Sequence, residues 1–179
     1  MTTYVALLRG INLGSHAKIK MPALRALFEA LDFADVQTYL QSGNVVFTTS
    51  DKDASVVASA IEQRISQDLK LTVPVLMRTA ADLKRIVERN PYLDQEQDFA
   101  KLHVTFLAEE PDAQRVSDLD LSFGEPDAFT VAGQEIYLHC PNGYGRTKLT
   151  GTWFERRLKV GATNRNWKTV TALHDLALG

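Results

Sequence analysis

The order of strand-like and helical segments in the first 79 residues constrains the fold more than any other feature of this sequence. Strand-like segments occur at residues 4–8, 36–40, 45–49 and 73–78. Stretches with apolar residues at helical spacing lie between them, at residues 21–31 and 57–69. This β-α-β-β-α-β order is typical of a ferredoxin-like unit, in which two helices cover one face of a four-stranded antiparallel sheet. The sequence therefore predicts an α+β fold whose first unit spans residues 1–79.

The second half, residues 80–179, shows a related order. A helix is predicted after Thr79, which has Asp82 at capping-box spacing, and a short acidic helix is predicted near residues 112–117. Strand-like segments occur at residues 101–107, 129–131 and 135–140. No residue-level repeat links the two halves, but the shared order favours a tandem arrangement. We therefore expect antiparallel sheets with helices, in two ferredoxin-like units packed as one compact protein.

Two helices are predicted to close the chain. Thr152 and Glu155 have capping-box spacing, and Gly161 suits the end of the helix that they begin. The last helix is predicted to begin within residues 163–166, where threonine or asparagine can cap it. Its inner face would hold Val170, Leu173 and Leu176.

The composition excludes several classes of protein. One cysteine, Cys140, rules out an internal disulfide framework, and its alternation with apolar neighbours indicates a buried residue rather than a nucleophile. No apolar run approaches the roughly 18 residues of a membrane span. The first residues, Met-Thr-Thr-Tyr, also lack the basic region of a signal peptide, so we expect a cytoplasmic protein without a membrane partner.

The charges are divided unevenly along the chain. Residues 91–135 carry eleven acidic residues against Lys101 and Arg115. In residues 141–170 only Glu155 opposes seven cations, namely Arg146, Lys148, Arg156, Arg157, Lys159, Arg165 and Lys168. Such a division can steer an anionic partner to one face, and it can equally serve only to keep both faces solvated.

Four polar segments lie at predicted ends of elements, at residues 9–12, 41–44, 142–148 and 163–167. Glycines let backbone amides approach a ligand, and arginine can hold a phosphate or carboxylate through two hydrogen bonds. Tyr144, between two glycines, could stack on a base. The predicted ligand-binding residues are Arg9, Asn12, Lys18, Lys20, Gln41, Ser42, Asn44, Arg146, Lys148, Asn164 and Arg165. The glycine spacing matches neither a phosphate-binding P-loop nor a dinucleotide fingerprint, so ordinary turns stay an alternative.

Signals for catalysis are weak. The four histidines show no metal-ligand spacing, so no metal and no cofactor is expected. His103 and His139 are predicted to point outward from strands, and Ser42 has the surroundings of a turn rather than of a nucleophile. If the protein were an enzyme, His16 or Lys20 would be the proton carrier, and the sequence leaves that question open.

Four runs resemble, in combination, a bacterial family of uncharacterised proteins, domain-of-unknown-function family number 1697. They are Ala6–Gly14, Lys18–Met21, Tyr39–Phe47 and Ala162–Val170. The resemblance implies a small cytoplasmic bacterial α+β protein with ferredoxin-like halves, and it implies no particular activity. It also implies that Arg9, Lys20, Gln41, Asn44, Asn164 and Arg165 belong to the signature of the family.

Four functions are compatible with these patterns. The sequence favours a binding module for an anionic small molecule, phosphorylated or nucleotide-like. The alternatives are a nucleic-acid-binding module, an enzyme acting on the same anionic ligand, and an oligomer in which Trp153 and Phe154 cover an interface. The binding hypothesis requires the cationic segments to share one face.

Overall fold

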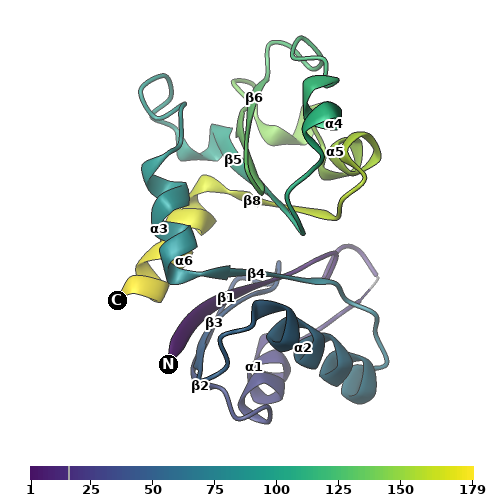
Figure 1. The fold of residues 1–179 in the computed structure, drawn as a ribbon, viewed down its shortest axis with the longest axis vertical. Helices are drawn as coiled ribbons and strands as arrows, with labels where there is room; N and C mark the ends of the chain where they lie inside the picture. The colour runs from purple at the N-terminus through teal and green to yellow at the C-terminus, as the bar shows by residue number, and fades with distance from the viewer. Residues whose placement is uncertain (16) are drawn as a thin grey trace. The chain divides into compact units, whose positions relative to one another are not determined.

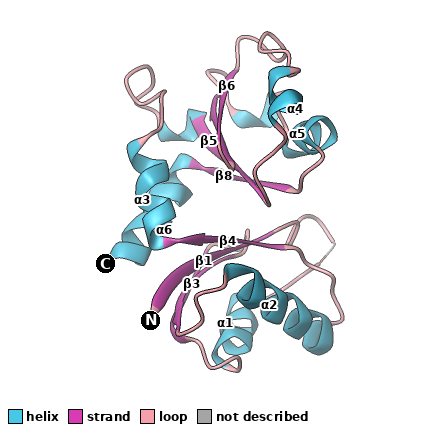
Figure 2. Cartoon of the chain, viewed as in Figure 1, coloured by secondary structure: helices cyan, strands magenta, loops and turns pink. Residues whose placement is uncertain are grey.

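The computed structural model describes residues 1–15 and 17–179, and its chain is of the predicted α+β class (Figures 1 and 2). Within these residues there are two four-stranded antiparallel sheets and six α-helices. The chain divides into two compact units, one formed by Met1–Lys84 with Leu173–Gly179 and the other by Arg85–Ala172. In the part of the chain that the structure describes, no helix is long and apolar enough to cross a membrane.

Unit 1 has the predicted ferredoxin-like order. Its elements are β1 (Thr2–Leu8), α1 (Met21–Glu29), β2 (Ala34–Tyr39), β3 (Asn44–Thr49), α2 (Ala54–Leu69) and β4 (Val75–Thr79). The sheet order is β2-β3-β1-β4, and every neighbouring pair is antiparallel. Because β1 pairs antiparallel with β3, with Leu7 opposite Asn44, the loop after β1 and the turn between β2 and β3 emerge at the same end of unit 1.

The core of unit 1 forms where alternate residues of β1 meet the apolar stripes of the two helices. Tyr4, Ala6 and Leu8 belong to the buried cluster that also holds Phe28 of α1 and Ile61 of α2. The helices begin where the sequence provides start signals, since a proline lies in the first turn of α1 and Asp53 caps α2. Burial of these side chains is the main force that holds α1 and α2 on the sheet.

Unit 2 contains a second run of the same order. Its elements are β5 (Leu102–Leu107), α4 (Ala113–Ser117), β6 (Ala128–Ala132), β7 (Glu135–His139), α5 (Gly151–Leu158) and β8 (Ala162–Asn166). Short 3-10 helices lie at Phe99–Lys101 and Tyr144–Arg146. The sheet order is β6-β7-β5-β8, which repeats the order of unit 1. Helices α3 (Ala80–Glu88) and α6 (Trp167–Leu178) each contain residues of both units.

The end of the chain differs from the prediction. Residues 163–166, where the last helix was expected to begin, belong to strand β8 (Ala162–Asn166) beside β5, and α6 begins only at Trp167. Asn166 accepts a hydrogen bond from the amide of Thr169, so it is the asparagine that caps α6. Five residues are too few to show a clear strand pattern, and pairing with β5 decided their conformation.

Helix α5 also begins elsewhere than expected. Thr150, not Thr152, accepts the hydrogen bond from the amide of Trp153, and the helix ends before Lys159, whose φ is 60°. Glu155, predicted to complete a capping box, accepts instead from the amide of Ala162 at 2.8 Å. Phe154 is fully buried in the core of unit 2, so it is not part of an exposed interface.

Candidate anion-binding site

The loop after β1 and the turn between β2 and β3 are joined by the side chain of Asn12. Its Nδ2 donates to the carbonyl oxygen of Ile19 at 3.0 Å and to that of Gln41 at 2.7 Å. Its Oδ1 accepts from the amide of Ile19 at 2.8 Å. We call residues 9–15, 17–20 and 40–44 the Asn12 junction, because one amide side chain links its segments. Two segments that the sequence predicted as parts of one site are therefore adjacent in unit 1.

The cations of the Asn12 junction lie beside this link. Ile19 is 5% exposed, whereas Lys18 and Lys20 on either side of it are exposed. Arg9 is half-buried, and its backbone amide donates to the carbonyl of Pro74 at 2.9 Å. Gln41 and Ser42 are exposed at the adjacent turn. His16 lies outside the described residues, so its predicted role as a proton carrier is not addressed by the structure.

The turn at residues 40–44 is shaped by Asn44 and Gly43. Asn44 is fully buried at the start of β3, and its Nδ2 donates to the carbonyl of Tyr39 at 2.7 Å and to Ser42 Oγ at 3.1 Å. The carbonyl of Gly43 accepts from the amide of Leu8. Asn44 therefore holds the turn in its conformation, and burial makes it a structural residue rather than a direct ligand contact.

Removing the Asn12 side chain tests how much this link contributes. Asn12→Ala is expected to lower the free energy of unfolding by about 2 kcal/mol, because three hydrogen bonds are lost at a residue whose φ is 55°. Asn12→Gly loses the same bonds without the backbone strain, and we expect it to be less destabilising by several tenths of a kcal/mol. Urea denaturation measures both. An unchanged free energy of unfolding in Asn12→Gly would show that the three hydrogen bonds of Asn12 contribute nothing to stability.

In unit 2 the predicted site residues separate into exposed and buried groups. Arg146 and Lys148 are exposed beside the 3-10 turn at Tyr144–Arg146. Asn164 and Arg165 are consecutive in β8, so their side chains lie on opposite faces of the sheet. The side-chain Nδ2 of Asn164 donates to Thr105 Oγ1 at 3.0 Å. These two residues therefore cannot contact one small ligand from the same face.

Arg165 is buried rather than at the surface. It is 6% exposed, and its Nη1 donates to Thr163 Oγ1 at 2.8 Å and to the carbonyl of Asn164 at 2.9 Å. Burial lowers the pKa of the guanidinium to about 10, which leaves it charged at neutral pH. That all predicted cations share one face stays a prediction.

His103 contradicts the expectation that it points outward. It is 6% exposed, its ring stacks on that of Tyr144 with centroids 4.5 Å apart, and its Nδ1 has no hydrogen-bond partner. Burial lowers the pKa of His103 to about 4. Tyr144, considered as a platform for a base, is thus already stacked within unit 2.

Cys140 is buried as predicted, and burial raises the pKa of its thiol to about 11, so it is no thiolate nucleophile.

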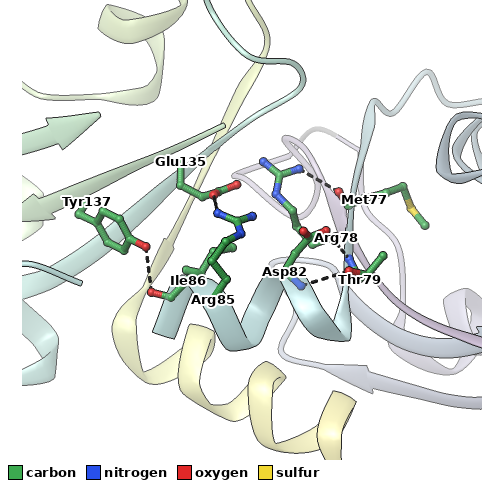
Figure 3. A network of polar contacts seen from close by, with 8 residues as sticks. All are labelled: Met77, Arg78, Thr79, Asp82, Arg85, Ile86, Glu135 and Tyr137. Carbon is green, nitrogen blue, oxygen red and sulfur yellow. Dashed lines mark hydrogen bonds and ion pairs between the residues drawn. The ribbon is translucent and has the colours of Figure 1, made fainter. Parts of the chain in front are cut away.

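Helix α3 has polar contacts at both of its ends, and the sequence predicted only the one at its start (Figure 3). In unit 1, Thr79 and Asp82 form the predicted capping box, with reciprocal hydrogen bonds of 2.9 and 3.1 Å. In unit 2, Arg85 forms an ion pair of 2.9 Å with Glu135, which is 1% exposed at the start of β7. The only sequence signal was an acidic residue in an otherwise apolar strand.

A second contact holds the same end of α3 on β7 (Figure 3). The hydroxyl of Tyr137 donates to the carbonyl of Ile86 at 2.9 Å. Burial raises the pKa of Tyr137 to about 12, so the hydroxyl stays a donor at neutral pH. These contacts stabilise the fold of unit 2, and nothing in their geometry resembles a ligand site. In residues 1–15 and 17–179 no group of acidic, histidine and cysteine side chains could hold a metal ion.

A protein of known structure shares this fold, and a family model matches much of the sequence. The chain is similar to a solved structure titled as that of conserved bacterial protein SP0830 from Streptococcus pneumoniae. The TM-score is 0.77 and the identity 24%, with 98% of each chain covered, so the likeness concerns the fold alone. No curated protein matches the chain. The family model described as protein of unknown function (DUF1697) matches residues 1–137. Since this match covers well over half of the sequence, the chain belongs to the DUF1697 family.

Proposed function

We propose that this chain binds an anionic small molecule, phosphorylated or nucleotide-like, at the Asn12 junction of unit 1. The observation that carries the proposal is the set of three hydrogen bonds made by the Asn12 side chain, which donates two and accepts one. The carbonyl oxygens of Ile19 and Gln41 both lie within 3.0 Å of one amide nitrogen. The backbone next to Lys20 is thereby held against the backbone next to Ser42.

Charge supports the same assignment. Residues 9–20 carry Arg9, Lys18 and Lys20 and no acidic residue, so the field around the loop favours an anion. Lys18 and Lys20 are exposed, and a link that orders the backbone lowers the conformational entropy lost when they close on a ligand. Gln41 and Ser42 add neutral hydrogen-bonding groups at the same place. The site suits a phosphate or pyrophosphate group better than a neutral ligand.

The nucleic-acid alternative has no comparable support. A ferredoxin-like sheet that binds single strands does so through aromatic side chains exposed on its open face. In unit 1 the face opposite the two helices carries the half-buried Tyr39 on its edge strand, but Val5, Leu7 and Val46 at its centre are aliphatic and at most 3% exposed. Tyr144 of unit 2 stacks on His103. We therefore do not propose a nucleic acid as the ligand.

Ligand binding should be visible as thermal stabilisation. With inorganic pyrophosphate or ADP at about 100 times its dissociation constant, the protein should gain about 2.7 kcal/mol and melt several degrees higher. The double variant Lys18→Gln/Lys20→Gln should lose most of this shift. A matched control, Lys52→Gln/Lys84→Gln, removes two other exposed lysines of unit 1 and should keep it. No shift with any phosphorylated compound, or an equal loss in both variants, would contradict the proposal.

The role of unit 2 is tested separately. If Arg146 and Lys148 contribute to the same ligand, Arg146→Gln/Lys148→Gln should weaken binding, measured by calorimetry, by about tenfold or more. Arg156→Gln/Lys168→Gln is the matched control, because both of its residues are exposed cations of unit 2. Unchanged affinity in the first of these variants would confine the site to unit 1.

A further inference from the structure

Strand β6 is an edge strand of the sheet of unit 2, in which Phe129 is 7% exposed and Val131 is half-buried. It is the first strand in the order β6-β7-β5-β8, and within the described residues its strand partner is β7 alone. The register pairs Ala132 with Glu135 across a two-residue connection. In such hairpins the residues that flank the turn form a hydrogen-bonded pair, and hydrogen-bonded pairs then alternate along the ladder. The backbone N–H and C=O groups of Phe129 and Val131 therefore point away from β7.

These backbone groups are available for pairing. In residues 1–15 and 17–179, no hydrogen bond joins the main chain of Phe129 or Val131 to a segment other than β7. The sequence of β6 is Ala-Phe-Thr-Val-Ala, with no charged residue and no proline. Exposed edge strands usually carry such residues because they prevent unwanted pairing. The lack of this protection is typical of an edge that receives a partner strand.

An apolar groove runs along this edge, between β6 and α4. A cavity of about 380 Å³ is lined by Val116, Leu119, Leu121, Phe129 and Val131 together with polar neighbours. A second cavity of about 210 Å³ shares Val116 and Val131 with the first and extends to Glu110. Leu121 is 72% exposed, although it is a large apolar residue. A strand added to β6 would place alternate side chains in this groove.

The segments that line the groove carry or adjoin four acidic residues, which we call its acidic rim. Glu110 lines one end, Asp112 and Asp118 cap the two ends of α4, and Asp120 precedes Leu121. Arg115 is the only cation of α4. A second copy of this chain paired edge to edge would bring two acidic rims together, which like charges oppose. The charge of the groove therefore suits a basic occupant.

We propose that the β6–α4 groove binds an extended, basic segment of a partner protein, which adds a strand to the sheet of unit 2. Main-chain hydrogen bonds to Phe129 and Val131 would supply affinity, as in other cases of strand addition. Apolar side chains at alternate positions would enter the groove beside Leu121, and the side chains between them would point to the opposite face of the sheet. Lysine or arginine residues at the two ends of the added strand would lie beside the acidic rim. This site is independent of the anion site proposed for unit 1.

Fluorescence anisotropy with the full chain tests this surface directly. The probe is a labelled peptide in which two lysines flank each end of an alternating valine–threonine stretch, and the charge-reversed control has glutamates in place of the lysines. The lysine peptide should bind, and the glutamate peptide should bind at least about tenfold more weakly. Asp118→Asn/Asp120→Asn should weaken the lysine peptide and reduce the dependence of its affinity on salt. Failure of the lysine peptide to bind, or equal binding of both peptides, would overturn the proposal.

Strand addition is distinguished from loose electrostatic attachment by blocking the backbone. Val131→Pro removes an outward N–H that takes no part in the ladder with β7, and it should abolish peptide binding. Val131→Thr keeps that N–H and is the control. Should Val131→Pro fail to fold, the lysine peptide N-methylated on its β6-facing amides gives the same test with the unaltered protein. Binding by the methylated peptide, or concentration-dependent dimerisation that Val131→Pro abolishes, would refute a partner peptide as the occupant.

Discussion

Gly43→Ala is expected to lower the free energy of unfolding by about 3 kcal/mol. Gly43 has a φ of 89°, which disfavours any residue with a Cβ atom. A Cβ at this position would lie 2.6 Å from Ile11 Cδ1 and 2.9 Å from Leu8 Cβ. Ile11 is 2% exposed and Leu8 is fully buried, so neither can move aside without disturbing the core of unit 1.

Gly14→Ala provides the matched control for this prediction. Gly14 lies in the same junction with a φ of 60°, but a Cβ there would meet nothing within 4 Å. Gly14→Ala should therefore lower the free energy of unfolding by only about 1 kcal/mol, which is the cost of the positive φ alone. Urea denaturation of the two variants separates strain from steric overlap. Equal effects would mean that the turn at residues 40–44 is not packed tightly against the loop after β1.

Between neutral and acid pH, His103→Phe is expected to lose less free energy of unfolding than the parent protein, by up to about 3 kcal/mol. Burial lowers the pKa of His103 from its usual 6.5 to about 4, so between these values the unfolded chain binds a proton that the folded chain does not. Stability contributed by the neutral ring is complete above about pH 6.5 and is lost as the pH falls toward about 4. Phenylalanine keeps an aromatic ring against Tyr144 and has no proton to bind.

The measurement is the free energy of unfolding of parent and variant at about pH 7 and about pH 4.5. The difference between the two values should be about 2–3 kcal/mol smaller in His103→Phe, because most of the linkage lies in that interval. Tyr144→Phe is the control, since it preserves the stacked pair and the titrating histidine and should retain the dependence of the parent. If the free energy of unfolding of His103→Phe fell with pH as much as that of the parent, carboxylates elsewhere would govern acid unfolding.

Three segments of unit 1 illustrate where local pattern suffices. Residues 4–8 and 45–49 are short segments rich in apolar residues next to turn residues, and residues 57–69 have apolar residues at helical spacing. All three fall within the elements predicted for them. Residues 162–166 illustrate where it fails. Ala-Thr-Asn-Arg-Asn has capping residues and no strand periodicity. It forms β8 because its backbone hydrogen-bonds to β5 in an antiparallel pair. Pairing between distant segments overrode local propensity there.

The candidate site shows the same division. Asn12 and Gln41 were identified from residue type, and the structure joins them through one hydrogen bond. Arg165 was identified as a surface cation, and a strand turned it inward. His103 was expected to point outward because strand alternation identifies two faces without saying which of them is exposed. The β6–α4 groove had no sequence signal, since an edge strand is defined only by the order of its sheet.

The sequence by itself determined the α+β class, the ferredoxin-like order of the first unit and the residue types gathered at residues 9–20 and 41–44. These follow from periodicity, capping and turn chemistry, which depend on neighbours within a few residues. Only the tertiary structure decided that residues 162–166 are a strand, that Arg165 and His103 are buried, and that Asn12 links two segments. Those outcomes depend on which faces and edges meet, and burial and hydrogen bonding between residues far apart in the chain select them.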